Sequence, residues 1–271
     1  MTDLAQSRNT AKSRRAATLF AIAVELLFLA YLAGACLVLT DFMDVNEPKW
    51  FLIRAAAPIL LVSELLGGAW RRGRDPLRLS AAGGIAILFL AWHVMSTVVA
   101  VNVGRAWVEV SELAGLICSF MLTARFAADV LHRDRVLWTL TLIGTAVSIY
   151  GIAQHFGLDF MTWQENNEVL VSRGVSFFGH ATFTASVLIQ IIPIAIGLAA
   201  TRRAWPARVL SGLAAGLMLY HVSFTGARMA TLSLVLTGAA VGLWIAWRRW
   251  RALRERGQRS EERRVGKECR L

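Results

Sequence analysis

Long uncharged apolar runs alternate with short polar or basic connections along the whole chain. A run of about 18 or more mostly apolar residues is long enough to cross a lipid bilayer as a helix. We therefore predict an all-α, polytopic membrane protein with about eight transmembrane helices. The predicted spans cover residues 18–40, 50–70, 79–101, 107–128, 136–154, 181–201, 208–225 and 229–247.

Composition and charge agree with a membrane protein. Of the 271 residues, 56% are hydrophobic and 17% are charged, and the mean hydropathy is +0.53. An ordinary soluble domain carries about 25% charged residues. The net charge of +11 does not indicate nucleic acid, because ten of the 29 basic residues follow Trp247 and most others flank the apolar runs. That distribution is a topology signal, and no nucleic-acid partner is expected.

The basic residues gather in alternate connections between the predicted spans. The clusters are Arg71, Arg72, Arg74 and Arg78, then Arg133 and Arg135, and then Arg202, Arg203 and Arg208. The positive-inside rule predicts that these connections are cytoplasmic, together with both termini. The long loop 155–180 then lies outside. A loop longer than about 12 to 15 residues is usually functional or disordered, and its mixed composition favours function.

The membrane domain, residues 18–247, lies between two charged segments. Residues 1–17 form a basic N-terminus, and the apolar stretch that follows is too long for a signal peptide, so an uncleaved first span is predicted. Residues 248–271 are predicted to be disordered or a basic cytoplasmic end. The last part, SEERRVGKECRL, resembles read-through from a vector or adapter rather than a natural terminus.

A short list of cations lies on the predicted outer side, against the positive-inside bias. Each precedes or opens a helix that starts there, where the positive end of the helix dipole disfavours a cation unless an anion is near. The negative end of the preceding helix is also close, so the dipole alone does not decide. A bound phosphate would balance these cations, which are Lys49, Arg54, Arg105, Arg173 and Arg228.

Arg228 and Arg173 are the strongest candidates for a substrate site. Arg228, in FTGARMATL, occupies a turn too tight to extend far from the bilayer, and an ionisable residue there is a functional candidate. Snorkelling to headgroups or pairing with Glu109 or Glu112 are the alternatives. Two guanidinium groups can bind a pyrophosphate and stabilise it as a leaving group.

Three further residues are accessory candidates. Lys49 and Arg54, in EPKWFLIR, would orient a lipid phosphate, although anchoring beside Trp50 explains them equally well. His180, like His155, lies at the outer face and can titrate as an acid or base. The other histidines, at positions 93, 132 and 221, are expected to be packing or interfacial residues.

Other chemistry finds little support in the sequence. Phosphate-binding glycine loops, His-Glu-x-x-His and Gly-x-Ser-x-Gly motifs are missing, and the three cysteines are scattered, so no metal or cofactor is expected. Glu25 and Glu64 lie inside predicted spans, either on an ion path or as buried hydrogen-bonded acids. With Pro193 they keep an ion or solute transporter open as an alternative, and a membrane scaffold is a third class.

The segment from Ile143 to Val235 resembles the O-antigen ligase family, which includes the O-antigen polymerases of bacterial inner membranes. Arg173-Gly174 through Gly179-His180 matches the Arg-Gly and Gly-His stretch that opens a span in that family. Thr225 to Arg228 matches a later turn loosely. The likeness extends through EPKWFLIR to about residues 40–247, and its main segments are YGIAQHFGLD, SRGVSFFGHATFTASVLIQIIPI and SFTGARMATLSLVL.

The resemblance implies a glycosyltransferase of the bacterial inner membrane. Such an enzyme would need neither a metal ion nor a cofactor. It would move a glycan from undecaprenyl pyrophosphate to an acceptor such as the lipid A core on the periplasmic side. Arg173 and Arg228 would bind the pyrophosphate, and membrane lipids would surround the protein. An O-antigen polymerase is the alternative within the family. The histidine that activates the acceptor in the family is expected beyond this chain, which is expected to be a truncated N-terminal portion.

Overall fold

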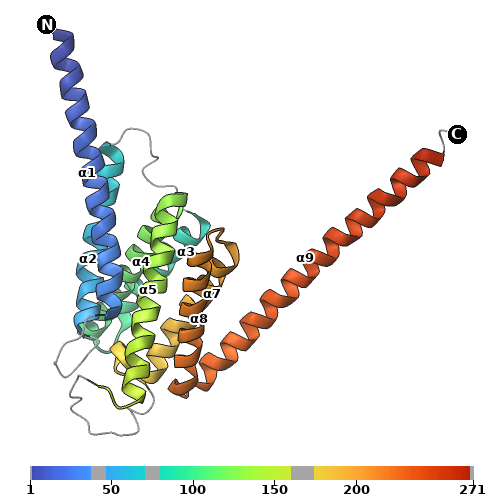
Figure 1. Ribbon diagram of the computed structural model, residues 1–271. Coiled ribbons are helices and arrows are strands. Elements are labelled where there is room, and N and C mark those ends of the chain that lie inside the picture. Colours follow the sequence, from blue (N-terminus) through green and yellow to red (C-terminus); the bar gives the residue numbers. More distant parts are fainter. Residues whose placement is uncertain (1, 38–46, 71–79, 160–173, 269–271) are drawn as a thin grey trace.

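The computed structural model describes residues 2–37, 47–70, 80–159 and 174–268, and helices dominate these ranges (Figure 1). The prediction of an all-α chain is confirmed for them. Eight helices are long and apolar enough to cross a membrane, and each overlaps one predicted span. The α-helices are α1 (Thr2–Leu37), α2 (Glu47–Trp70), α3 (Ala81–Ser96), α4 (Val103–Ala127), α5 (Val130–His155), α7 (Ala181–Thr201), α8 (Trp205–Thr225) and α9 (Arg228–Glu268). Two short 3₁₀ helices are η1 (Thr97–Val99) and η2 (Ser176–Phe178).

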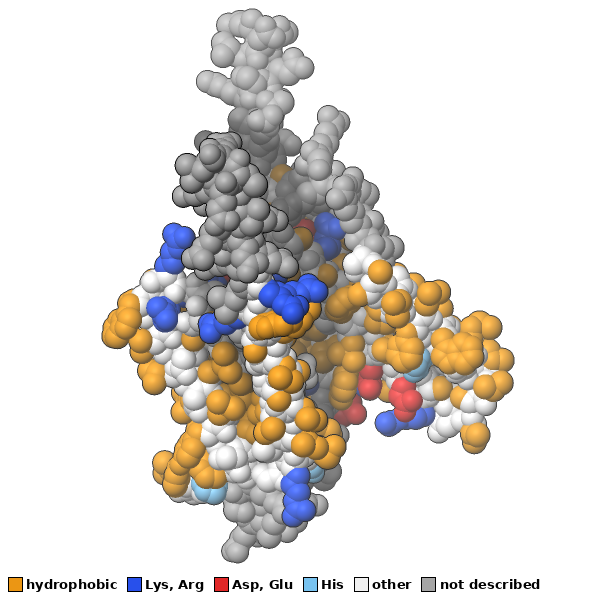
Figure 2. Space-filling model, turned by 90° about the vertical axis from the view of Figure 1, so that its right-hand side faces the viewer, with side chains coloured by type: hydrophobic (Ala, Val, Ile, Leu, Met, Phe, Trp, Pro, Cys, Tyr) orange, Lys and Arg blue, Asp and Glu red, His pale blue; other side chains and the backbone are white. Residues whose placement is uncertain are grey.

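Successive helices run in opposite directions, so the connections alternate between two ends of the bundle (Figure 1). We name them the Lys49 end, where α2 begins, and the Arg135 end, at the top of Figure 1. Figure 2 shows hydrophobic side chains over most of the coloured surface, with most Lys and Arg side chains toward the top. The described arginines near the Arg135 end, outside α9, are Arg125, Arg133, Arg135, Arg202, Arg203 and Arg208. The predicted cluster 71–78 lies outside the described residues.

Side chains at the helix starts satisfy backbone N–H groups that have no partner within the helix. Ser80 caps α3, Asn102 caps α4 and Asp129 caps α5. Helix α8 ends at Gly226, whose φ of +63° falls in the left-handed region that glycine adopts without strain. Helix α7 runs through Pro193 as one continuous helix.

Two apolar cores lie side by side, and α5 contributes to both. The first is built mainly from α1, α2 and α4, where Phe28 and Phe126 stack with ring centroids 4.8 Å apart. The second is built from α5, α7 and α8 around residues such as Leu188 and Met218. At the Arg135 end, Arg202 binds Asp134 of α5 at 2.7 Å. This hydrogen bond raises the pKa of the Arg202 guanidinium above its ordinary value.

Helix α9 leaves the bundle and extends away from it (Figure 1). Its apolar stretch is almost wholly exposed, with only 6% of it buried. The helix continues through the charged tail to Glu268, and a disordered or basic cytoplasmic end stays a prediction for this segment. The tail is rich in Arg and Glu, which favour helix, and the preceding apolar stretch supplies the helical nucleus.

Candidate functional site

The last residues of the long loop fold into the bundle at the Lys49 end. Gly174, Val175, Ser176 and Phe178 are buried, and they precede the start of α7. Gly174 and Ser176 adopt positive φ angles of +60° and +51°, which turn the backbone sharply. A buried backbone segment must find hydrogen-bond partners inside the protein. The sequence therefore produces a buried insert, which we name the 174–180 insert.

Helices α5 and α7 supply those partners. The backbone N–H of Ser176 donates to Gln154 Oε1 at 2.6 Å, and its hydroxyl donates to the Val147 carbonyl at 2.7 Å. The Thr184 hydroxyl donates to the Val175 carbonyl at 2.5 Å. These bonds hold the insert against α5 and α7. Neither Gln154 nor Ser176 was predicted from the sequence as a site residue. The only signal for Gln154 was its position as a polar residue at the end of an apolar run.

Gln154 also links the insert to the chain that follows α5. Its amide nitrogen donates to Asp159 Oδ2 at 3.0 Å, and the Tyr150 hydroxyl donates to Asp159 Oδ1 at 2.7 Å. Both carboxylate oxygens of Asp159 therefore accept hydrogen bonds from α5, and the residue is partly buried. Residues 160–173 lie outside the described residues.

His221 of α8 holds the beginning of the insert. The side chain is fully buried, and its Nε2–H donates to the Gly174 carbonyl at 2.9 Å. The ring packs directly on Gly151 of α5, where a Cβ atom would stand 2.1 Å from Cε1 and Nε2. Within the described residues its Nδ1 makes no hydrogen bond. The expected packing role for this histidine is thus a specific one, because it joins α5, α8 and the insert.

Lys49 fastens the insert to the other half of the molecule. Its side chain is only 5% exposed. The ammonium group donates to the Phe177 carbonyl and lies 4.4 Å from the centroid of the Phe178 ring, a cation–π contact. Lys49 forms no ion pair with any residue that the structure describes. The ammonium group of Lys49, an accessory candidate for the substrate site, therefore makes contacts that stabilise the fold.

The other cations of α2 and α4 have acidic partners. Arg54 binds Glu112 across the α2 and α4 interface, and both side chains are about three-quarters buried. Arg105 pairs with Glu109 at 3.2 Å, four residues along α4, and both are largely exposed. The two acids that were weighed as partners for Arg228 therefore bind other cations.

Arg228 is the first residue of α9 and is exposed. Within the described part of the chain its guanidinium makes no hydrogen bond or ion pair. His180 caps α7, because its Nδ1 accepts a hydrogen bond from the Thr182 N–H at 3.2 Å, and its ring is exposed. Arg173 lies outside the described residues. Arg228, His180 and Lys49 share one end of the bundle, but no described contact joins them.

Aromatic rings of α5 and α8 meet at the Lys49 end, and those of α8 lie close to Arg228 along the chain. His155 stacks on Phe224, with ring centroids 4.0 Å apart and an interplanar angle of 17°. Tyr220 meets Phe224 edge to face at 4.5 Å. Phe224 lies in the last turn of α8 and precedes Arg228, the first residue of α9, by four residues.

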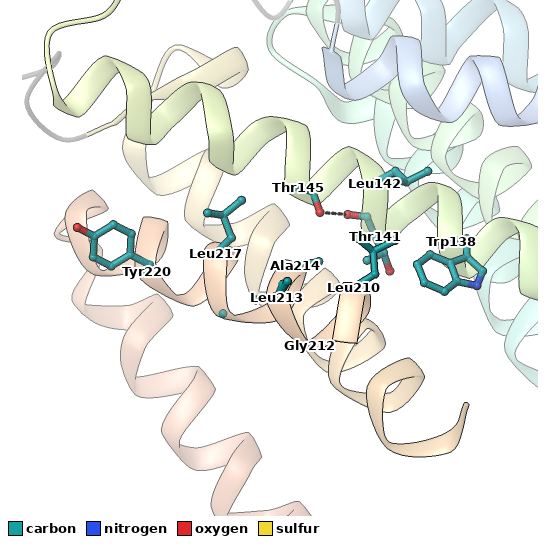
Figure 3. Close-up of a pocket in the computed structure, with 11 residues that line it drawn as sticks. Trp138, Thr141, Leu142, Thr145, Leu210, Gly212, Leu213, Ala214, Leu217 and Tyr220 are labelled. Carbon is teal, nitrogen blue, oxygen red and sulfur yellow. Dashed lines mark hydrogen bonds between the residues drawn. The ribbon is translucent and has the colours of Figure 1, made fainter. Parts of the chain in front are cut away.

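Tyr220 also marks one end of a cavity of about 500 Å³ between α5 and α8. In Figure 3 the side chains of Trp138 and Leu142 extend from α5, and Leu213 and Leu217 extend from α8. The Thr145 hydroxyl donates to the Thr141 carbonyl at 2.8 Å, so it is already satisfied within α5. The walls are therefore apolar, and they suit a hydrocarbon chain. The full lining is Trp138, Thr141, Leu142, Thr145, Leu210, Gly212, Leu213, Ala214, Gly216, Leu217 and Tyr220.

The two acids buried within spans have cationic partners nearer the Arg135 end. Glu25 accepts hydrogen bonds from His132 and Arg135, each at 2.7 Å. Glu64 pairs with Arg125 at 3.5 Å. The contacts fit the alternative in which both are buried hydrogen-bonded acids. In the part of the chain that the structure describes, no group of three His, Cys, Asp or Glu side chains is arranged to hold a metal ion.

Comparison with protein families, with characterised proteins and with solved structures finds no match for this chain.

Proposed function

We propose that this chain acts in a lipid-linked glycan transferase of the O-antigen ligase type. The reaction moves a glycan from undecaprenyl pyrophosphate to an acceptor such as the lipid A core, on the periplasmic side of the bacterial inner membrane. The observation that carries the proposal is Arg228, an exposed guanidinium without a described protein partner at the Lys49 end. The likeness of the segment Ile143 to Val235 to that family is the second support.

Membrane insertion and orientation are part of the proposal. Eight long apolar helices support a multi-pass protein. The charge difference between the two ends supports an orientation in which the Arg135 end and both termini are cytoplasmic. The Lys49 end, with Arg228 and the 174–180 insert, then faces the periplasm. That is the side on which a lipid-linked glycan is transferred in this family.

The depth of Arg228 suits a lipid pyrophosphate. Twenty residues separate Arg228 from Arg248, and at 1.5 Å per residue the helix between them is about 30 Å long, the thickness of the hydrocarbon layer. Arg228 then lies at one boundary of that layer, at the level of phosphate groups. A guanidinium with no carboxylate partner keeps its N–H donors for two phosphate oxygens at once.

The groove between α5 and α8 supports a substrate with a long hydrocarbon chain. Its cavity of about 500 Å³ has apolar walls and runs along the two helices. Tyr220 lies at the end of the groove toward the Lys49 end, eight residues before Arg228. A polyprenyl chain in the groove would direct its pyrophosphate toward that arginine.

A transporter has less support in the contacts. That alternative depends on Glu25 and Glu64 lining an ion path, and each of them is paired with a cationic side chain. An O-antigen polymerase would use the same donor and differ in its acceptor, so it shares the predictions for Arg228.

The experiment introduces Arg228→Ala, Arg228→Lys or Arg203→Ala into the chromosomal gene that encodes this chain. Arg203 is an exposed arginine at the Arg135 end and serves as the matched control. Loss of a group that stabilises charge in a transition state lowers the rate by about 10²- to 10³-fold. We expect Arg228→Ala to abolish polymeric glycan on lipopolysaccharide, Arg228→Lys to retain part of it, and Arg203→Ala to retain all of it.

The location of the accumulated donor separates transfer from transport. With Arg228→Ala we expect the glycan on its pyrophosphate carrier to accumulate on the periplasmic face, where an added glycosidase can digest it in spheroplasts. Accumulation on the cytoplasmic face would instead indicate a transporter. Normal glycan on lipopolysaccharide with Arg228→Ala, at a normal level of the protein, would refute the proposal.

A further inference from the structure

Three tryptophans and three arginines form three stacked pairs on α9 where its apolar stretch ends. The Arg248 guanidinium carbon lies 4.7 Å from the centroid of the Trp244 ring system, and the next two pairs are separated by 4.2 and 4.5 Å. Each arginine follows its tryptophan by four residues, the spacing that brings side chains together on a helix. We name the six residues the Trp–Arg ladder: Trp244, Trp247, Trp250, Arg248, Arg251 and Arg254.

The ladder occupies one side of the helix and is open to its surroundings. At 3.6 residues per turn, the six positions fall within about 160° of the helix circumference. About half of each tryptophan is exposed: 52% for Trp244, 47% for Trp247 and 52% for Trp250. None of the described helices packs over it, since α9 leaves the bundle (Figure 1). The ladder is therefore a free surface of the described structure.

The charge of the ladder has one sign. The sequence contains no aspartate or glutamate between Gly226 and Arg254. Stacking on an indole ring orients a guanidinium and leaves its in-plane N–H donors unused. These donors match phosphate oxygens, to which arginine can bind with two hydrogen bonds. The surface therefore complements an anion that also offers apolar contact to the indole rings.

The depth of the ladder matches lipid headgroups. If Arg228 lies at one boundary of the hydrocarbon layer, Arg248 lies about 30 Å away, at the other boundary. Tryptophan rings prefer that boundary, and arginine side chains reach beyond it. The ladder then crosses from the end of the acyl chains into the phosphate layer of the leaflet at the Arg135 end.

We propose that the Trp–Arg ladder binds anionic lipid headgroups, such as phosphatidylglycerol, in that leaflet. The indoles hold the guanidinium groups at the height of the phosphodiesters, and the guanidinium groups bind the excess negative charge. Tryptophans alone would anchor the helix in any lipid, whereas the stacked arginines select anionic lipid. The inference requires membrane insertion but does not depend on glycan transfer.

The test uses the full chain reconstituted in phosphatidylcholine vesicles that contain spin-labelled phosphatidylglycerol or spin-labelled phosphatidylcholine. Electron spin resonance measures how strongly each lipid associates with the protein. We expect a several-fold preference for phosphatidylglycerol. Raising the NaCl concentration from about 0.1 M to about 1 M should reduce it, because the screening length falls from about 10 Å to about 3 Å.

Two triple variants remove the same positive charge from different places. The ladder variant carries Arg248→Gln, Arg251→Gln and Arg254→Gln. The matched control carries Arg133→Gln, Arg203→Gln and Arg208→Gln, which are exposed arginines at the same end of the bundle. A basic side chain at an anionic lipid surface contributes at most about fivefold, and the indole rings hold the ladder arginines at the level of the phosphates. We expect the ladder variant to lose the preference and the control to keep most of it.

A third variant tests the stacking itself. Replacing the three ladder tryptophans by leucine keeps the charge and removes the rings, and the preference should fall by at least about twofold. Size-exclusion profiles that match the native protein establish that the variants fold. Equal losses in the ladder variant and the control, no loss in the ladder variant, or no loss in the leucine variant would each overturn the proposal. The proposal would also be overturned if the native ladder bound an acidic protein and showed no binding of anionic lipid.

Discussion

Replacing Gly151 by alanine would drive a methyl group into the buried ring of His221. The new Cβ atom would stand 2.1 Å from Cε1 and Nε2, where carbon atoms in contact prefer about 3.5 to 4.0 Å. The ring is fully buried, and its Nε2–H is bound to the Gly174 carbonyl. It cannot withdraw from α5 without breaking that hydrogen bond.

The size of the effect follows from three contributions. Overpacking a buried site costs about 1 to 3 kcal/mol. Breaking the hydrogen bond between His221 and Gly174 adds about 1 to 3 kcal/mol, because both groups stay buried. Alanine favours the helix over glycine by up to about 1 kcal/mol, which offsets part of the loss. These contributions sum to about 1 to 6 kcal/mol, and we expect Gly151→Ala to lower the free energy of unfolding by about 3 kcal/mol.

The assay is reversible unfolding by SDS in mixed micelles, followed by tryptophan fluorescence. Gly197→Ala, in α7, is the matched control, because its Cβ atom meets nothing within 4 Å and the change should be neutral or slightly stabilising. The double variant Gly151→Ala with His221→Ala removes the clash, so its loss should be smaller than the sum of the two single losses. Additive losses, or equal stability of the Gly151 and Gly197 variants, would refute the reasoning.

Three further predictions concern the same fold. Gly174→Ala should lower the free energy of unfolding by about 2 to 4 kcal/mol, and Gly226→Ala by about 1 to 2 kcal/mol. Both glycines have positive φ, but only at Gly174 would the new Cβ atom meet neighbouring atoms, at 2.9 to 3.3 Å. Equal losses in the two variants would contradict this prediction. Glu25→Gln should cost about 1 to 3 kcal/mol in the same SDS assay, and Glu109→Gln, in an exposed pair, less than about 0.5 kcal/mol. Lys49→Met should increase hydrogen exchange in the 174–180 insert by about tenfold through loss of one hydrogen bond and one cation–π contact; unchanged exchange would show that the amine does not hold the insert.

The spans were the most predictable part of the fold, because uncharged length alone decides whether a helix can cross a bilayer. Helix α7 has the predicted bounds, residues 181–201. Helix α5 begins at Val130, six residues before the predicted span, because charge ends an apolar run without ending a helix. Helix α9 extends past its span for the same reason. The pattern of hydrophobic residues did not predict that the end of the long loop would be buried.

The site was less predictable, because its contacts join distant parts of the chain. Arg54 and Glu112 are 58 residues apart, so nothing local in the sequence distinguishes this neutralised cation from an available one. Lys49 binds a backbone carbonyl 128 residues away, and such an acceptor has no signature in the sequence. Residue type and topology selected the cations at the Lys49 end, but only tertiary packing separates those with partners from those without.

That separation gives the ranking of the cations its physical meaning. A charge near an apolar medium must be neutralised or hydrogen-bonded, either by the protein or by a ligand. Lys49 and Arg54 meet this requirement within the fold, so replacing them should first affect stability. Arg228 is exposed and has no partner among the described residues, so on the proposed function we expect an anion outside the protein, a lipid headgroup or a substrate pyrophosphate, to bind it. Glycan transfer distinguishes these two anions, because only a substrate phosphate makes the reaction depend on Arg228 while stability stays unchanged.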